Sequence, residues 1–205
     1  MFDESALRRD LLSLMPIEFY MKHIIKSKNW YFYNYLNIPH TEILDKMDYF
    51  KEIVSSALGI NFHSLQMVGS AKTGYSLSPN KIFRPFHSEV GEEESSDIDI
   101  ALVSSRLYGE YWYKLRHQKQ VYYDTAYYNR LATSIYKGFI NDKDLLKING
   151  IKNDWESKVQ PLNIRLQDKL GFVHPVTYRI YRSWEDLEDY QIYSIKKAKK
   201  MMEGR

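Results

Sequence analysis

Two aspartates stand one residue apart in an apolar, β-branched segment, Asp97 to Val103, which reads DIDIALV. Side chains two residues apart on a strand point to the same face, so we expect Asp97 and Asp99 to be neighbours. Two carboxylates that close cannot both stay ionised at little cost unless a cation lies between them. The spacing therefore predicts a divalent-metal site, and carboxylate oxygens suit magnesium, with manganese as a substitute.

A second motif precedes this strand. The segment 65–68 is short and apolar, and it ends in Gly69-Ser70. A glycine lets the backbone approach a ligand closely, and a serine hydroxyl can donate a hydrogen bond to a phosphate. A strand, a Gly-Ser turn and a second strand carrying Asp-x-Asp together favour a site for phosphate and metal.

This order of motifs resembles the nucleotidyltransferase-fold superfamily, which includes DNA polymerase beta and small stand-alone bacterial nucleotidyltransferases. The resemblance covers roughly residues 65 to 103 and is moderately specific. It implies that Gly69 and Ser70 hold a nucleoside triphosphate, and that Asp97 and Asp99 bind magnesium and carry catalysis. Two further residues are assigned to nucleotide binding, Ser96 beside the acids and Lys72 in the first helical turn after Gly69. An exposed turn is an equal alternative for Lys72.

The chain departs from the family pattern at two points. The segment 81–94 separates the Gly-Ser turn from the acids and predicts a loop near the site, in which Arg84 and His87 either contact a polyanionic substrate or are solvated. The family also adds a third carboxylate from a later strand, but the predicted strand 176–181 contains no acid and carries Arg179 instead. The remaining candidates for the third acid are Asp168, Glu185 and Asp186.

Composition sets the broad class. With 205 residues, 44% hydrophobic and 27% charged, the chain suits one globular domain over 1–205, divided into an N-terminal helical segment over 1–60, a core over 65–182 and a C-terminal helix over 183–205. No transmembrane run or signal peptide is evident, so we expect a cytoplasmic protein with no membrane partner. The absence of cysteine excludes disulfides and thiolate chemistry, and a net charge of +3 is too small to indicate nucleic acid by itself.

The hydrophobic pattern predicts an α+β fold, a small mixed sheet carrying both motifs and packed with several helices. Strands are expected at 65–68, 98–103 and 176–181. Helices are expected at 5–14, 17–26, 42–58 with Thr41 as N-cap and Gly59 as C-cap, 111–117, 122–136, 155–170 closed by Gly171, and 187–201.

Three clusters have more than one interpretation. Tyr122, Tyr123, Tyr127 and Tyr128 could stack nucleic-acid bases, but their spacing favours a core-facing stripe. The aromatic run 30–35 has the same ambiguity and could also contact a protein partner. The lysine-rich segment 196–200 is typical of a solvated helix end, with a phosphate-contacting patch as the alternative.

The resemblance implies a magnesium-dependent transfer of a nucleoside monophosphate from a nucleoside triphosphate to an acceptor hydroxyl. The acceptor is an RNA end, a protein, a small molecule or a second nucleotide. Many small bacterial members belong to toxin-antitoxin or antiphage systems, and the size of this chain is similar. The alternative hypothesis is a catalytically inactive module that binds nucleotide or RNA and acts through a partner.

Overall fold

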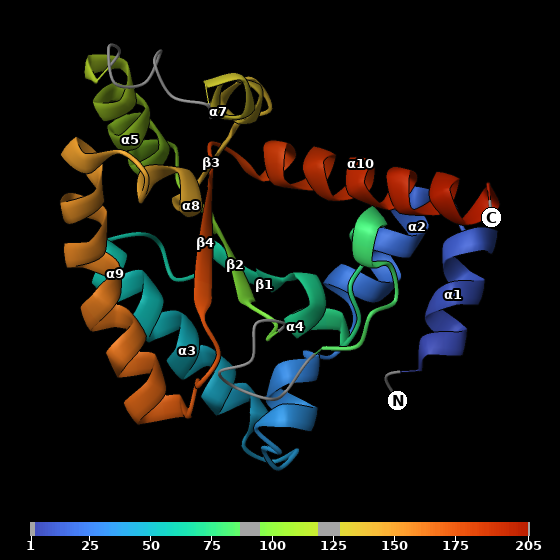
Figure 1. The fold of residues 1–205 in the computed structure, drawn as a ribbon. Coiled ribbons are helices and arrows are strands. Elements are labelled where there is room, and N and C mark those ends of the chain that lie inside the picture. The colour runs from blue at the N-terminus through green and yellow to red at the C-terminus, as the bar shows by residue number, and fades with distance from the viewer. Residues whose placement is uncertain (1–2, 87–94, 119–127, 205) are drawn as a thin grey trace.

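The computed structural model describes residues 3–86, 95–118 and 128–204. These residues form a four-stranded mixed sheet in the order β1-β2-β4-β3 (Figure 1). Strand β2 pairs antiparallel with β1 and parallel with β4, and β4 pairs antiparallel with β3. The strands are β1 (Leu65–Val68), β2 (Ile98–Val103), β3 (Phe139–Asn141) and β4 (Val176–Tyr181). The predicted α+β class and three predicted strands are confirmed, whereas β3 was not predicted because three residues carry too little alternation.

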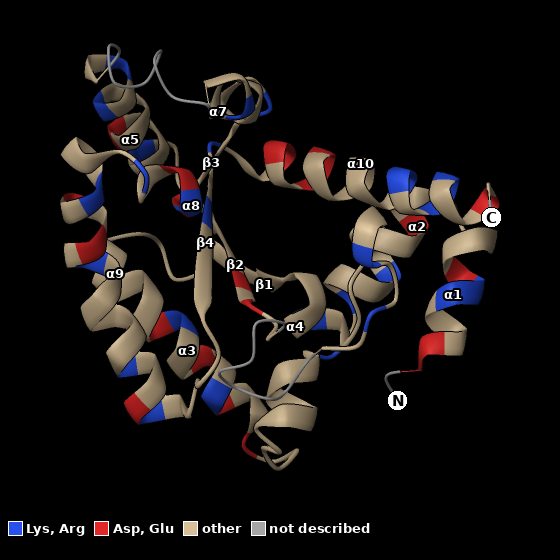
Figure 2. Cartoon of the chain, in the orientation of Figure 1, with Lys and Arg blue, Asp and Glu red and all other residues tan. Residues whose placement is uncertain are grey.

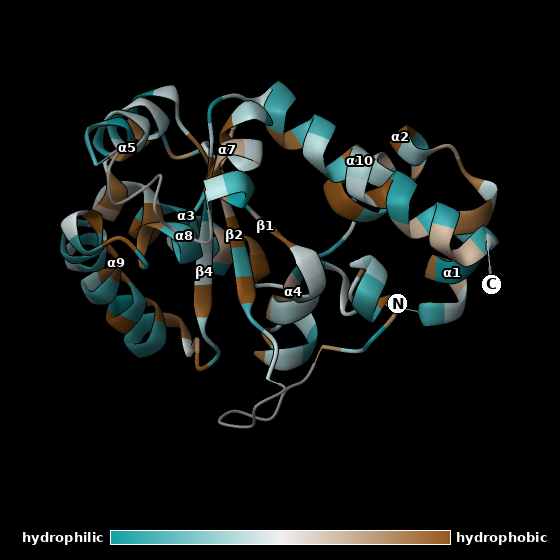
Figure 3. Ribbon diagram, turned by 45° about the horizontal axis from the view of Figure 1, so that its top comes forward, coloured by the Kyte–Doolittle hydropathy of each residue, from teal (hydrophilic) through white to brown (hydrophobic). Residues whose placement is uncertain are grey.

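One face of the sheet holds the main core. Ile98, Ile100 and Leu102 alternate into it from β2, and they pack against helices that lie on one side of the sheet in Figure 1. Those helices are α3 (Ile43–Leu58), α5 (Ser105–His117) and α9 (Asn149–Leu170). In Figure 3, β2 and β4 alternate between hydrophobic and more hydrophilic residues along their length. Asp99 lies between Ile98 and Ile100 in β2, so its side chain belongs to the opposite face of the sheet.

The opposite face is covered by α10 (Trp184–Glu203) at one end of the sheet and by the short α4 (Gly69–Thr73) at the other. Leu187 of α10 packs against the sheet, whereas Ile195 and Ala198 pack further along against the N-terminal helices. These are α1 (Glu4–Ser13), α2 (Pro16–Phe19) and the π-helix η1 (Tyr20–Ile25). Helix α10 thus ties the N-terminal segment to the sheet, as Figure 1 shows.

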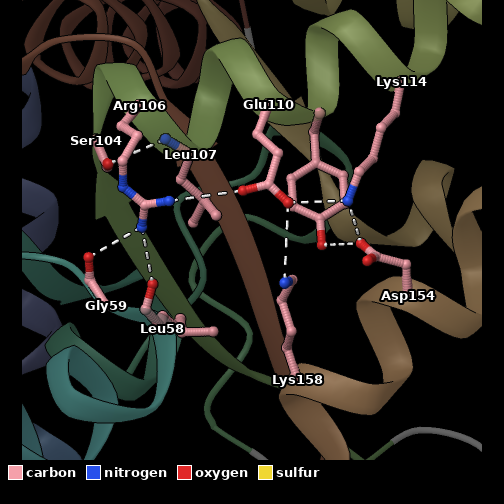
Figure 4. A network of polar contacts seen from close by, with 10 residues as sticks. Leu58, Gly59, Ser104, Arg106, Leu107, Glu110, Lys114, Asp154 and Lys158 are labelled. Carbon is pink, nitrogen blue, oxygen red and sulfur yellow. Dashed lines mark hydrogen bonds and ion pairs between the residues drawn. The ribbon is translucent and has the colours of Figure 1, made fainter.

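Polar contacts hold α5 between α3 and α9 (Figure 4). Arg106 donates to the carbonyl oxygens of Leu58 and Gly59 at the end of α3, at 3.2 and 2.9 Å. Lys114 contacts both Glu110 of its own helix and Asp154 of α9, at 2.8 and 2.6 Å. The helices behind the core face are therefore fixed at their polar rims as well as by hydrophobic burial.

Several predicted boundaries shift. Thr41 is not the N-cap of α3, because Glu42 takes that position, whereas Gly59 and Gly171 end their helices in left-handed conformations as predicted. The predicted helix 17–26 is divided between α2 and η1. The remaining short elements are the π-helix η2 (Tyr31–Tyr35), the 3-10 turn η3 (Pro79–Lys81), α7 (Tyr128–Tyr136) and α8 (Asp142–Leu145).

The aromatic run 30–35 contributes to the core, since Tyr31 and Phe32 are fully buried there. Of the tyrosine cluster, Tyr122, Tyr123 and Tyr127 lie outside the described residues. Tyr128 packs at the edge of the main core. Within the described ranges, none of the helices has the length and apolar character that a membrane span requires.

Candidate functional site

The two predicted motifs meet at one end of the sheet. The β1–β2 register places Val68 opposite Asp99, so Gly69 begins α4 directly beside that carboxylate. The β2–β4 register places Thr177 on the other side of Asp99. Sequence positions separated by about thirty and about eighty residues therefore surround one side chain, as the antiparallel and parallel pairings require.

Gly69 packs tightly against Asp99. Its φ is +66°, a left-handed conformation that side-chain-bearing residues rarely adopt. A Cβ atom at this position would lie only 2.5 Å from Oδ2 of Asp99. Glycine is therefore required here both by the backbone and by the carboxylate, and the neighbour that excludes a side chain is the proposed metal ligand.

The environment of Asp99 disfavours its charge. Burial is the main cause that raises the pKa of this carboxyl, and the nearby charge of Asp97 raises it further. The guanidinium of Arg179 and the hydroxyl of Thr177, which donates to Oδ1 at 3.0 Å, act in the opposite direction. Asp99 is thus a carboxylate that an added cation would stabilise.

Asp97 precedes β2 and is more exposed. Its Oδ2 lies 2.5 Å from Nζ of Lys143, which stands in α8 immediately after β3. Lys143 supplies a positive charge at the place where the sequence predicted a metal ion. The pair joins the motif strand to the β3–α8 connection, an element that the hydrophobic pattern did not predict.

A polar cavity of about 300 Å³ opens beside the acids. Its walls include Ser70, Lys81, Arg84, Ser96, Asp97 and Asp99. Four predicted site residues are therefore brought to one cavity, and a fifth, Gly69, abuts it through Asp99. Lys81 and Arg84 add two cations to the walls that carry the carboxylates. Arg84 lies in the predicted insertion, and His87 of the same segment is outside the described residues.

Lys72 has a different position from the one the sequence suggested. Its side chain is buried, and Nζ donates to the carbonyl oxygen of Ser27 at 2.6 Å. Burial lowers its pKa to about 8. Lys72 is not among the residues that line the acidic cavity, so α4 directs this cation toward η1 and Ser27 and away from the predicted phosphate.

The expected third carboxylate is not found among the predicted candidates. Asp168 and Glu185 are exposed on α9 and α10, and Asp186 bonds to Arg182 and Ser183 at the start of α10. The strand position opposite Asp99 is taken by Thr177. Within the described ranges, no group of three histidine, cysteine, aspartate or glutamate side chains converges on a metal position.

One additional carboxylate lies near the site. Asp142, at the start of α8, is 3% exposed and accepts a hydrogen bond from the backbone N–H of Tyr178 at 2.9 Å. Its other oxygen is buried without a hydrogen-bond partner among the described residues. Burial raises its pKa to about 6, and the charge of Asp99 contributes to this increase. Little in the sequence indicated Asp142, because the strand β3 directly before it has only three residues.

Arg179 lies on the same face as Asp99, and its closest contacts are aromatic. The guanidinium carbon lies 4.7 Å from the ring centre of Tyr190 and 5.3 Å from that of Phe139. A hydrogen bond to the hydroxyl of Tyr181 measures 3.4 Å. The positive charge of Arg179 therefore acts on Asp99 at longer range and neutralises it only in part.

The donor set agrees with a magnesium site completed by substrate. Magnesium is commonly held by one or two carboxylates, with water and substrate phosphates filling the other positions. Asp97 and Asp99 supply the two carboxylates, and the cavity supplies space and cations for phosphate. Comparison of this chain with protein-family models, curated proteins and solved structures gives no match in any of the three.

Proposed function

We propose that this protein is a magnesium-dependent nucleotidyltransferase that moves a nucleoside monophosphate from a nucleoside triphosphate to an acceptor hydroxyl. The observation that supports this most directly is the shared cavity of Asp97, Asp99, Ser70, Lys81 and Arg84. Carboxylates and cations in the same cavity walls match the two needs of a metal-bound triphosphate. The resemblance of the Gly-Ser and Asp-x-Asp motifs supports the same reaction class.

In this proposal the chain acts mainly by positioning and by charge. Asp97 and Asp99 hold the metal, and Ser70, Lys81 and Arg84 bind the phosphates. The acceptor oxygen forms a bond to the α-phosphorus, the bond from that phosphorus to the bridging oxygen breaks, and pyrophosphate leaves with the electron pair. The hydroxyl proton passes to solvent. Magnesium, when bound, neutralises the triphosphate charge.

Lys143 adds a condition for this activity. Because it contacts Asp97, metal binding requires the ammonium to move, and a triphosphate offers it a new anionic partner. Two carboxylates can hold one metal ion well but a second metal ion only poorly. We therefore expect the protein to bind nucleotide with magnesium but to turn it over slowly until the natural acceptor is present.

The test is incubation with each labelled nucleoside triphosphate, magnesium or manganese, and total RNA or lysate as a source of acceptors. Label transfer by the wild type that is lost in Asp97→Asn and in Asp99→Asn supports the proposal. The control is Asp168→Asn, which makes the same chemical change on the exposed surface of α9. Transfer that persists in both site variants contradicts it.

The alternative is a module that binds nucleotide or RNA without transferring it. Thr177 at the expected acid position and the Lys143–Asp97 pair favour this alternative. Titration calorimetry separates the two, because a binding module retains nucleotide affinity with no transfer under any acceptor condition. If the wild type shows neither nucleotide binding nor transfer, both the enzyme and the binding module are contradicted.

A further inference from the structure

A second and larger cavity lies between α7 and α10. Its volume is about 770 Å³, more than twice that of the acidic cavity. Helix α10 presents one face to it, with Tyr193, Lys197 and Lys200 at spacings of three and four residues. Arg130 of α7 and Lys137, the residue directly after that helix, are seven residues apart and also line it. We refer to it as the α7–α10 cavity.

The walls of this cavity are cationic. Arg130, Lys137, Lys197 and Lys200 line it, with Arg130 also ion-paired to Asp144 of α8, and none of the described residues that line it is an aspartate or a glutamate. Figure 2 shows the cause on α10, whose first half is marked by acidic residues and whose second half is marked by basic ones. Lys137 directly follows α7 and stands about 10 Å from Arg130 along the direction of the helix axis, a distance that exceeds a single phosphate. The charge favours an extended polyanion.

Aromatic rings accompany the cations. Tyr193 is 43% exposed, and the ammonium groups of Lys137 and Lys197 each lie 4.9 Å from its ring centre. Tyr190 and Phe139 also line the cavity, with Arg179 against both rings. A base can stack on the ring of Tyr193 when a lysine ammonium that lies over it moves to a phosphate of the same strand.

The α7–α10 cavity and the acidic cavity have neighbouring walls. Pro79 and Asn80 of η3 line the former, and Lys81 of the same turn lines the latter. Arg179 forms a second connection, because it contacts Phe139 and Tyr190 and also lines a small cavity with Asp99. The turn η3 therefore borders both cavities, and Lys81 adds a positive charge on the side of the acids.

We propose that the α7–α10 cavity binds single-stranded RNA or DNA, with one end of the strand directed toward Asp97 and Asp99. The cationic walls, the exposed ring of Tyr193 and the position of η3 at the border of both cavities carry this inference. Binding of the strand is independent of the transfer reaction. Its role as the acceptor rests on the proposed function.

Fluorescence anisotropy with labelled single-stranded oligonucleotides tests the site. RNA and DNA of the same sequence are titrated without nucleotide or divalent cation, over a series of salt concentrations. We expect binding that weakens with salt, and preference for one of the two sugars identifies the natural ligand. No binding to either strand at low salt overturns the proposal, as does competition by a mononucleotide equal to that of the oligonucleotide.

Matched variants test whether the oligonucleotide binds in the α7–α10 cavity. Lys197→Gln is expected to weaken binding and to lower the salt slope by about one, whereas Lys196→Gln makes the same charge change one residue away, outside the cavity lining, and should change little. Tyr193→Ala should weaken binding by about fivefold or more, and Tyr193→Phe should preserve it. Equal effects of Lys196→Gln and Lys197→Gln would overturn the assignment.

The two proposals can fail separately. Asp97→Asn removes transfer in the proposed function but leaves oligonucleotide binding intact, because Asp97 is outside the α7–α10 cavity. Transfer to a small acceptor with no oligonucleotide binding would overturn only the strand site. Oligonucleotide binding that depends on Lys197, without transfer under any condition, would overturn only the enzyme. Thermal unfolding of each variant verifies that the exposed substitutions leave the fold unchanged.

Discussion

Lys143 places its ammonium 2.5 Å from the carboxylate of Asp97, so a lysine occupies the position next to the predicted metal ligand. The pair joins α8 to the start of β2 and forms only because β3 brings the two segments together. In the proposed function, a metal ion would compete with the Lys143 ammonium for the oxygen atoms of Asp97. This relationship would make the proposed metal site sensitive to Lys143, a residue outside the proposed ligand set.

Removal of Lys143 should strengthen metal binding. An exposed ion pair of this kind contributes about 0.2–1 kcal/mol, so Lys143→Ala is expected to increase manganese affinity by up to about fivefold. Titration calorimetry with manganese in the absence of nucleotide measures the effect. Lys152→Ala, which removes a surface lysine paired with Glu156 on α9, is the control. Unchanged or weaker manganese binding in Lys143→Ala would show that the ammonium does not compete.

Gly69 should tolerate no side chain. Gly69→Ala is expected to cost about 1 kcal/mol for its left-handed backbone and roughly a further 1–2 kcal/mol because Asp99 must move. Gly171→Ala is the matched control, since its φ is +73° and its Cβ would meet Leu36 at an ordinary 3.8 Å. Urea unfolding compares the two. Gly69→Val should in addition prevent nucleotide binding, and equal costs for Gly69→Ala and Gly171→Ala would refute the contact with Asp99.

Removal of the charge of Asp99 should stabilise the metal-free protein. Burial raises the folded-state pKa of this carboxyl, so the stability linked to its protonation is present at low pH and is lost as pH rises through the folded pKa. Asp99→Asn should therefore be more stable than the wild type at pH 7, with a gain that shrinks in acid. Asp97→Asn should change stability by less than about 1 kcal/mol. Urea unfolding at pH 7 and pH 4 distinguishes them, and a large loss of stability in Asp99→Asn would be contrary to this expectation.

Asp142 should give the protein a pH-dependent stability. Its folded pKa is about 6, above the ordinary 3.8, so the contribution is fully present below about pH 4 and is lost as pH rises through 6. This change in the pKa of Asp142 between the unfolded and folded states corresponds to about 3 kcal/mol of folding stability. Unfolding free energies of Asp142→Asn and the wild type between pH 4 and pH 7 measure it. The difference between them should move in favour of the variant with rising pH, and a constant difference would contradict the buried charge.

Lys72 should be dispensable for nucleotide binding. Its ammonium bonds to Ser27 and not to the acidic cavity, so Lys72→Met is expected to leave nucleotide affinity unchanged. The folded pKa of about 8 lies below the ordinary 10.5, so wild-type stability should rise with pH between these values, and the variant should lack this rise. Calorimetry and unfolding at pH 7 and pH 10 check the two statements. A large loss of nucleotide affinity would return Lys72 to the site.

The amino-acid sequence alone predicted the strands that carry the two motifs. Alternation of apolar residues is a local property, so the strand that holds Asp99 and the one that precedes Gly69 could be read without knowledge of their partners. Local signals also predicted Gly59 and Gly171 as helix ends, because a left-handed terminus favours glycine wherever the helix lies. The resemblance implied that Gly69 and Asp99 belong to one site, and the register of β1 with β2 brings the two residues into contact.

Tertiary structure decided which charged groups share the site. Lys143 and Asp142 follow a three-residue strand whose pairing with β4 depends on residues nearly forty positions away, so no local pattern could place them near Asp99. Lys72 is one helical turn from Gly69, yet the rotation of α4 turns it toward Ser27. The α7–α10 cavity arises from two helices far apart in the chain. Sequence determines the period of burial along each segment, whereas the charges that meet across segments depend on long-range packing.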